Sequence, residues 1–322
     1  MTARDSVLEL QARMRRSIIG QDDVVDRILL GLLANGNILL EGLPGLAKTR
    51  AVKSLAKNLD ARMSRIQFTP DLLPSDITGS EILHSQNGEN VLQFQPGPIF
   101  NNIILADEIN RAPAKVQSAL LEAMEERQVT VAGKTRKMEP LFIVAATQNP
   151  IEQEGTYPLP EAQMDRFLMH VMIQYPSKDA EKDVVRLVRG EESTAASSTE
   201  EAPISQEVIF QARKEIQAVQ VSPALDQYIV DLIDATRHPE KFSQDLRRWI
   251  QIGASPRGGI GLDKASRAFA WMRGGDYTTP DDVRAIAHDV LRHRVSLSYD
   301  ANAERVTANQ VVSEVIKLVA VP

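Results

Sequence analysis

A glycine-rich loop between an apolar run and a helical pattern is the feature that most constrains this chain. Residues 38–40 are apolar, and apolar residues recur at helical spacing from Val52 to Leu59. Between these segments lie Gly42, Leu43, Pro44, Gly45, Leu46, Ala47, Lys48 and Thr49. Loop glycines let backbone N–H groups turn toward a phosphate, and the N-terminus of the following helix adds a favourable dipole. The order of strand, loop and helix therefore predicts a nucleoside-triphosphate site.

Two side chains at the end of this loop suit a magnesium nucleotide. Lys48 can reach the outer phosphates, and the Thr49 hydroxyl can hold Mg²⁺. Ala47 stands where the common G-x-x-x-x-G-K-[ST] pattern has its second glycine, so a methyl group must fit beside the phosphates. A glycine-rich turn without a ligand is the alternative, and the flanking strand and helix argue against it.

An acidic pair ends a second apolar run. Residues 103–106 are apolar and are followed by Asp107 and Glu108. We expect a buried parallel strand whose carboxyl end opens on the ligand crevice. Asp107 would hold the Mg²⁺ hydration shell beside Thr49, and Glu108 would polarise the water that attacks the γ-phosphate. Many strands simply end in solvated acids, so this interpretation depends on the phosphate loop upstream.

The composition narrows the class of protein. The 322 residues include 43 acidic and 37 basic side chains, a net charge of −6, which argues against a general polyanion-binding surface. The absence of cysteine excludes disulfides and thiolate metal sites. No apolar run approaches the ~20 residues of a membrane span, and the N-terminus lacks a signal-peptide pattern. We expect a cytoplasmic protein without membrane insertion.

The chain is predicted to be an α/β protein with a second, helical unit. Strand-like runs alternate with helical patterns at residues 38–40, 65–68, 103–105, 142–145 and 168–173. This alternation predicts a parallel sheet covered on both faces, within a core of residues 1–189. Residues 190–203 are polar and predict a flexible linker. Residues 204–322 predict an all-helical lid, because Ser222, Ser255 and Thr279 each stand before a proline, as N-caps do.

Two insertions interrupt the predicted core. Residues 69–100 are rich in Pro, Asp, Gly and Asn, and residues 129–138 alternate apolar and polar side chains about a central glycine. The second pattern predicts a β-hairpin. Its cations Lys134, Arg136 and Lys137 could meet DNA, but such a group is usually a solvated face, and the acidic chain favours that alternative.

Several motifs in the same order resemble AAA+ ATPases, and specifically the MoxR group, over nearly the whole chain. They are residues 19–21 (Ile-Gly-Gln), 42–49, 67–79, 107–111 (Asp-Glu-Ile-Asn-Arg), 146–150 (Ala-Thr-Gln-Asn-Pro) and 161–167 (Glu-Ala-Gln-Met-Asp-Arg-Phe). The resemblance implies an αβα P-loop core with a lid, in which residues 69–100 are the helix 2 insert and residues 129–138 a hairpin before sensor 1. It also implies ATP and Mg²⁺ as cofactors, with nucleotide contacts from Gly20, Gln21, the loop and Arg50.

Three polar residues take catalytic roles by this resemblance. Asn149 follows a predicted strand, so its amide would emerge near Asp107 and Glu108 as sensor 1; the alternative is a turn residue before a proline. Arg166 would be an arginine finger that enters a neighbour's site, unless it only pairs with Asp165 or Glu161. Arg257 would be sensor 2, unless it belongs to a simple loop, and as sensor 2 it would make the lid rotate with nucleotide state.

The implied function is ATP-driven remodelling in a homo-hexameric ring. The resemblance associates MoxR proteins with chaperone-like maturation of client proteins or insertion of metal cofactors into them, and with partners that carry von Willebrand factor A domains. A motor subunit of a magnesium-chelatase-like complex is the first alternative. A DNA-remodelling helicase subunit is the second, and the excess of acidic residues disfavours nucleic acid as a partner.

Overall fold

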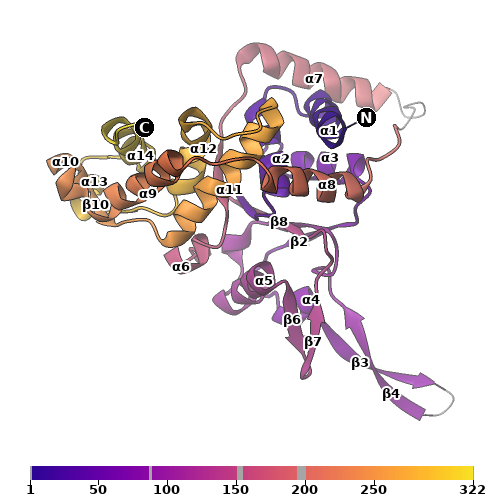
Figure 1. The fold of residues 1–322 in the computed structure, drawn as a ribbon. Coiled ribbons are helices and arrows are strands. Elements are labelled where there is room, and N and C mark those ends of the chain that lie inside the picture. The colour runs from indigo at the N-terminus through magenta and orange to yellow at the C-terminus, as the bar shows by residue number, and fades with distance from the viewer. Residues whose placement is uncertain (1, 87–88, 151–154, 194–200, 322) are drawn as a thin grey trace.

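A five-stranded parallel sheet forms the centre of the core, as predicted. The computed structural model describes residues 2–86, 89–150, 155–193 and 201–321 (Figure 1). The strand order is β2 (Met63–Gln67), β5 (Ile103–Asp107), β8 (Ile143–Gln148), β1 (Ile38–Gly42) and β9 (Met169–Ile173). All neighbouring strands are parallel, so the loops that follow β1, β5 and β8 leave the sheet at one edge.

Helices cover both faces of this sheet. Ile38 and Leu40 of β1 belong to one apolar cluster, whereas Leu39 belongs to a second, so alternate side chains of this buried stretch supply two cores. The first cluster includes α1 (Ala3–Ser17), α2 (Asp22–Leu33) and α3 (Lys48–Asn58). The second includes α4 (Pro74–Thr78) and α5 (Ala114–Glu126). Short helical turns, η1 (Ile109–Arg111) and α6 (Glu161–Met164), follow β5 and precede β9.

Two antiparallel hairpins extend from the core on the same side (Figure 1). The longer one, β3 (Gly79–Gln86) with β4 (Glu89–Pro96), lies in the 69–100 insertion, and β6 (Gln128–Val131) pairs with β7 (Lys134–Lys137) in the range predicted for a hairpin. The guanidinium of Arg136 lies 3.6 Å from the centre of the Phe94 ring, and Lys134 Nζ lies 3.8 Å from Glu81 Oε1. The second hairpin therefore braces the base of the first.

The segment between core and lid includes a helix that the sequence did not predict. Helix α7 (Lys178–Ser193) continues past residue 190, where the predicted linker begins, and residues 194–200 of that linker lie outside the described residues. After them, Arg13 Nη1 donates to the Ala202 carbonyl at 2.7 Å, and Arg16 pairs with Glu201 at 2.9 Å. The chain thus rejoins the core along α1. No helix in the described part of the chain is long and apolar enough to cross a membrane.

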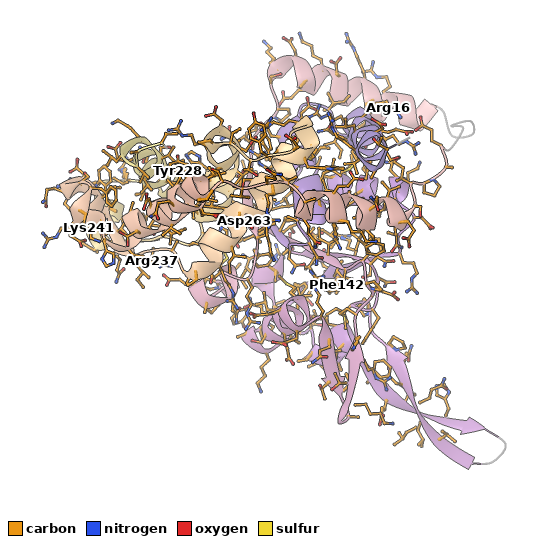
Figure 2. All side chains as sticks on the ribbon, viewed as in Figure 1. Arg16, Phe142, Tyr228, Arg237, Lys241 and Asp263 are labelled. Carbon is orange, nitrogen blue, oxygen red and sulfur yellow. The ribbon has the colours of Figure 1, made fainter. Side chains whose placement is uncertain are left out.

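The C-terminal part is mostly helical. It comprises α8 (Gln206–Gln217), α9 (Pro223–Arg237), η2 (Pro239–Lys241), α10 (Gln244–Trp249), α11 (Pro256–Arg273), α12 (Pro280–Leu291), α13 (Tyr299–Ala303) and α14 (Ala308–Leu318). Ser222, Ser255 and Thr279 accept hydrogen bonds at the N-termini of α9, α11 and α12, as predicted. Tyr228 is buried in the lid core, where its hydroxyl accepts from Arg284 Nε at 3.1 Å (Figure 2).

One element departs from the all-helical expectation. β10 (Ile250–Ile252) pairs antiparallel with β11 (Ser296–Leu297). Strands of three and two residues are too short to show an alternating pattern in the sequence. Helix α8 also packs on the core, where Arg213 Nη2 donates to the Leu32 carbonyl at 2.7 Å.

The N-terminus of α12 carries a buried carboxylate, so we expect a pH-dependent stability there. Burial of Asp282 raises the pKa of its carboxyl, but hydrogen bonds from Arg273 and Thr279 outweigh that effect, and the pKa lies below its ordinary value. A lowered folded-state pKa stabilises the fold above the unfolded pKa, and this stability is lost as pH falls through the folded pKa. Asp282→Asn should lower the free energy of unfolding by about 2 kcal/mol at neutral pH. In urea titrations, that difference should shrink below about pH 4; a constant difference down to pH 2 would contradict it.

Candidate active site

The predicted phosphate loop connects β1 to α3 and has an open face. Gly45 has φ +83°, and a methyl group placed there would meet no atom within 4 Å beyond its chain neighbours. Ala47 also takes a left-handed conformation (φ 58°, ψ 17°), at a cost of about 1 kcal/mol for a residue with a Cβ. The loop therefore keeps a strained backbone and free space beside it, which is the form of an anion-binding concavity.

Lys48 lies at the junction of two strand ends. Its Nζ donates to the carbonyl of Gly42 at 2.5 Å and to the carbonyl of Gln148 at 3.2 Å. Gly42 ends β1 and Gln148 ends β8, so the ammonium group is positioned at the edge where both strands open. Thr49 follows in the first turn of α3.

Asp107 is nearly buried at the end of β5, the strand beside β8. Its Oδ1 accepts from the Thr147 hydroxyl at 2.6 Å, and its Oδ2 accepts from Arg65 Nη2 at 2.6 Å. Carboxylate and hydroxyl oxygens are the ligands that Mg²⁺ prefers, so Asp107 and Thr49 form a suitable donor set. The sequence analysis missed Arg65 and Thr147, because the register of β2 and β8 against β5, not any motif, brings them to Asp107.

Glu108 leaves the strand end in a left-handed conformation (φ 57°), and its N–H donates to the Thr147 hydroxyl at 2.9 Å. Its Oε2 accepts from Gln67 Nε2 at 2.9 Å and lies 3.0 Å from Arg111 Nε. Its carboxylate is thus oriented by two neighbours. Asn149 follows β8 directly and is buried, so it lies at the same edge of the sheet as Asp107.

The predicted nucleotide contacts outside the loop lie on the segments that flank it. Gly20 has φ +74°, and a Cβ there would come within 2.6 Å of Ala180 Cβ at the start of α7. Gln21 Nε2 donates to the Gln174 carbonyl after β9 at 2.8 Å. Arg50 Nε donates to the Ser17 carbonyl at 2.7 Å, so one nitrogen of its guanidinium binds the end of α1.

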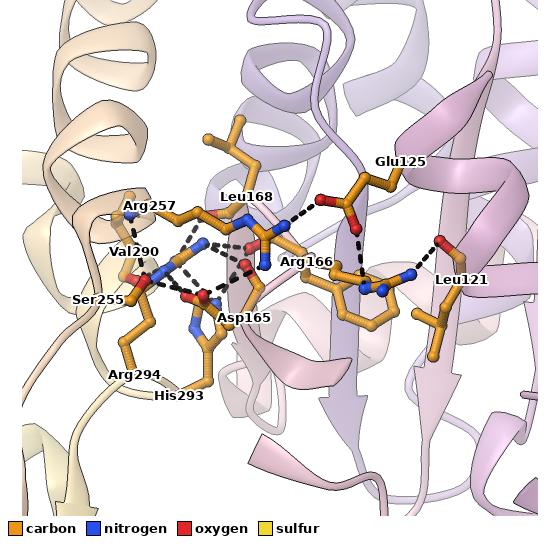
Figure 3. A network of polar contacts seen from close by, with 11 residues as sticks. Leu121, Glu125, Asp165, Arg166, Leu168, Ser255, Arg257, Val290, His293 and Arg294 are labelled. Atoms are coloured by element: carbon orange, nitrogen blue, oxygen red, sulfur yellow. Dashed lines mark hydrogen bonds and ion pairs between the residues drawn. The ribbon is translucent and has the colours of Figure 1, made fainter. Parts of the chain in front are cut away.

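Arg166 and Arg257 meet at one carboxylate. Arg166 Nε lies 3.0 Å from Glu125 Oε2, and Arg257 Nη2 pairs with the other oxygen, Oε1 (Figure 3). Arg166 Nη1 also donates to the Leu121 carbonyl at 2.9 Å. Of the alternatives for Arg166, an ion pair exists, but with Glu125 of α5 and not with Asp165 or Glu161. Nothing in the sequence singled out Glu125, which is one of several acids on an amphipathic helix.

The buried Arg294 holds Asp165, the residue before the candidate arginine finger Arg166. Arg294 Nε donates to Asp165 Oδ1 at 2.9 Å, and its Nη2 donates to the carbonyls of Asp165 and Phe167 at 3.0 and 2.6 Å. Burial lowers the pKa of Arg294 to about 10, and the charge of Asp165 opposes that shift. Arg294 thus remains a cation at neutral pH and joins the lid to the core.

Together, the loop, the acidic strand end and the parallel sheet define a P-loop nucleoside-triphosphatase. The family model for "ATPase family associated with various cellular activities (AAA)" matches residues 37–169, and the model for the AAA lid domain matches residues 246–315. The chain is 46% identical to Chaperone MoxR1 of Mycobacterium tuberculosis, over 96% of this chain and 80% of that protein. It is 31% identical to Protein MoxR of Methylorubrum extorquens, over 98% and 94%.

A solved structure agrees with these relatives. The crystal structure of a candidate ATPase from Cytophaga hutchinsonii has a TM-score of 0.91 and 42% identity, and the match covers 99% of this chain and 96% of that one. The chain belongs to the MoxR family of AAA+ ATPases. It binds nucleotide and hydrolyses ATP, and its family points to oligomeric assembly and interaction with clients.

Proposed function

We propose that this ATPase remodels client proteins in a chaperone-like manner, leading to their maturation or to insertion of a metal cofactor. The proposal rests on one observation: the core that contains the ATPase site also extends two hairpins, and these contact each other (Figure 1). The name of the relative Chaperone MoxR1 supports the same class of activity.

For the chemistry, we assign the roles by position at the sheet edge. Lys48 would neutralise the outer phosphates, and Thr49 and Asp107 would hold Mg²⁺, which would screen the phosphate charge. Glu108 orients the attacking water, and Asn149 contacts that water or the γ-phosphate. Arg65 and Thr147 fix the orientation of the Asp107 carboxylate, because each donates a hydrogen bond to it.

We assign the two arginines to the neighbour's site in a hexameric ring. Arg166 and Arg257 pair with the same Glu125, so they present their charge at one place. A guanidinium that enters a neighbouring site stabilises the charge of the transition state. In this arrangement Arg257 acts beside Arg166 on the same neighbouring nucleotide, so each active site is built from residues of two subunits.

The longer hairpin is our candidate for contact with a client. Leu83 and Leu92 are paired across it and are 58% and 61% exposed. Ile82 and Val91 point to the opposite face and are also exposed, so apolar side chains occupy both faces. Exposed apolar groups of this kind mark protein contacts. Lys134 and Arg136 contact Glu81 and Phe94 of this hairpin, which favours a bracing role over DNA binding.

A von Willebrand factor A protein is the adaptor that we propose, because the resemblance to the MoxR group implies such a partner. The adaptor should bind the ATP and ADP states with different affinity, since a nucleotide can drive work only through such a difference. Pull-downs with Glu108→Gln in ATP and with wild type in ADP should recover it in unequal amounts. Equal recovery would contradict this coupling.

We predict that the exposed apolar side chains of the longer hairpin can be changed without loss of ATP turnover. Leu83→Ser with Leu92→Ser should reduce client remodelling at least about tenfold, because a contact core depends on a few apolar anchors. ATP turnover should stay within about twofold, since exposed side chains contribute little to stability. Val230→Ser on α9, also 57% exposed, is the matched control. Full remodelling by the double variant would exclude Leu83 and Leu92 from client contact.

A further inference from the structure

The ion-pair network around Arg166 and Arg257 has a fixed half and an exposed half (Figure 3). In the fixed half, Asp165 accepts from Arg294 at 2.9 Å and from the Ser255 hydroxyl at 2.8 Å. The Arg294 side chain is only 2% exposed. Arg257 Nη1 lies 3.6 Å from Asp165 Oδ2, beyond hydrogen-bond distance. Asp165 is therefore satisfied without Arg257.

The exposed half consists of Glu125 and the two arginines that it binds. About a third of the Glu125 and Arg166 side chains is exposed, and 45% of Arg257. Each carboxylate oxygen of Glu125 takes one guanidinium. Two positive charges share one negative charge, so this half of the network keeps a net positive charge at a solvent-exposed position. Such contacts exchange readily for a stronger anion, because water screens them and neither partner is trapped.

A phosphate group can replace the Glu125 carboxylate as the partner of the two arginines, because it has more acceptor oxygens and more negative charge. It offers several acceptor oxygens and carries more than one negative charge, and arginine binds it in the same forked manner as a carboxylate. We propose that Glu125 is a resident substitute for phosphate, which holds Arg166 and Arg257 together while the neighbouring site is empty and releases them to the neighbour's nucleotide. This inference rests on the assignment of the two arginines to the neighbour's site.

Two consequences follow for the assembled protein. The negative charge of Glu125 offsets the repulsion between the guanidinium groups of Arg166 and Arg257. The two arginines therefore stay close together in the absence of nucleotide. Glu125 also competes with the nucleotide, so it raises the ATP concentration at which the arginines engage. Glu125 is thus a positioning residue that sets the threshold of the ATPase.

Glu125→Gln tests this directly, because the amide keeps the shape and one acceptor oxygen but removes the charge. In the full-length, assembled protein, the ATP concentration for half-maximal turnover should fall about fivefold, equivalent to about 1 kcal/mol. The shift should shrink as salt is raised, because exposed ion pairs are screened. Glu125→Asp, which retracts the charge by one methylene, should shift it less and in the same direction.

Glu122→Gln is the matched control, since Glu122 lies one turn earlier on α5, is exposed and has no ion pair among the described residues. It should leave the ATP dependence unchanged. Because turnover depends on Arg166, the double-mutant cycle is measured by binding of a fluorescent ATP analogue to the assembled protein. Glu125→Gln should tighten binding when Arg166 and Arg257 are intact and should have no effect when both are replaced by Ala. A half-maximal concentration that is unchanged or raised in both Glu125 variants would overturn the inference.

The same experiments separate this inference from the assignment beneath it. If replacing Arg166 and Arg257 leaves turnover of the assembled protein unaffected, the assignment to the neighbour's site fails. If that replacement abolishes turnover but Glu125→Gln behaves as Glu122→Gln does, only the role of Glu125 fails.

Discussion

Glu108→Gln should bind ATP normally and lower ATP turnover by about a hundredfold or more. The amide cannot accept the proton of the attacking water, but it retains the size of the side chain and can still contact Gln67, which binds Glu108 Oε2 at 2.9 Å. Stopped-flow binding of a fluorescent ATP analogue and steady-state phosphate release measure the two properties separately. Normal turnover in this variant would remove Glu108 from the water-orienting role.

Lys48→Ala should behave differently. It removes the ammonium group that lies between the ends of β1 and β8, so nucleotide affinity itself should fall about tenfold to a hundredfold. The contrast between the two variants is the informative result, because a general loss of folding would reduce binding in both. Circular dichroism of each variant provides the check on folding.

Arg166→Ala should lower turnover of the assembled protein by about a thousandfold while leaving ATP binding largely intact. The structure supports this expectation because Arg166, which lies between α6 and β9, pairs with Glu125 of α5 and is a third exposed. The residue before it, Asp165, is anchored by Arg294. The contact between Arg294 and Asp165 fixes the backbone next to Arg166, and the partly exposed guanidinium of Arg166 can reach another subunit. Arg186→Ala is the control and should have no effect, because Arg186 is an exposed residue of α7 whose ion-pair partner within the described part of the chain is Asp183.

Mixing variants tests whether Arg166 acts between subunits. A ring of Arg166→Ala and Glu108→Gln subunits contains some interfaces in which an intact Glu108 faces an intact Arg166. Such rings should regain part of the activity that each variant lacks alone. If mixed rings form, as native mass spectrometry can show, and still do not hydrolyse ATP, Arg166 acts within its own subunit or has no catalytic role.

The sequence predicted the elements whose signal is local. Apolar runs such as residues 103–106 must be buried strands, and Ser255 before Pro256 must cap a helix, because each pattern is decided by its own few residues. The loop of Lys48 and the acids at the end of β5 were predictable for the same reason.

The rest depends on which distant segments meet. Arg65 reaches Asp107 only through the register of β2 against β5, and Glu125 meets Arg257 only because α11 packs near the end of α5. Neither residue has a spacing or neighbour that marks it. The strand pair β10–β11 was missed because its strands are too short to alternate visibly.

The buried Arg294 has a mechanical consequence. It ties the lid to the core through Asp165 and through the carbonyls of Phe167 and Leu168 at 2.6 and 3.2 Å, and its own side chain is only 2% exposed. If the lid hinged away from the core here, Arg294 would lose its contact with Asp165, and the carbonyls of Phe167 and Leu168 would lose their donor. Breaking such a buried ion pair costs several kcal/mol. Each subunit would then move as a single rigid body, which differs from the expectation that the lid rotates against its own core with nucleotide state. The displacement that ATP drives would accumulate at the interfaces between subunits. In such a ring, the hairpins would move together with the core and the lid of their own subunit.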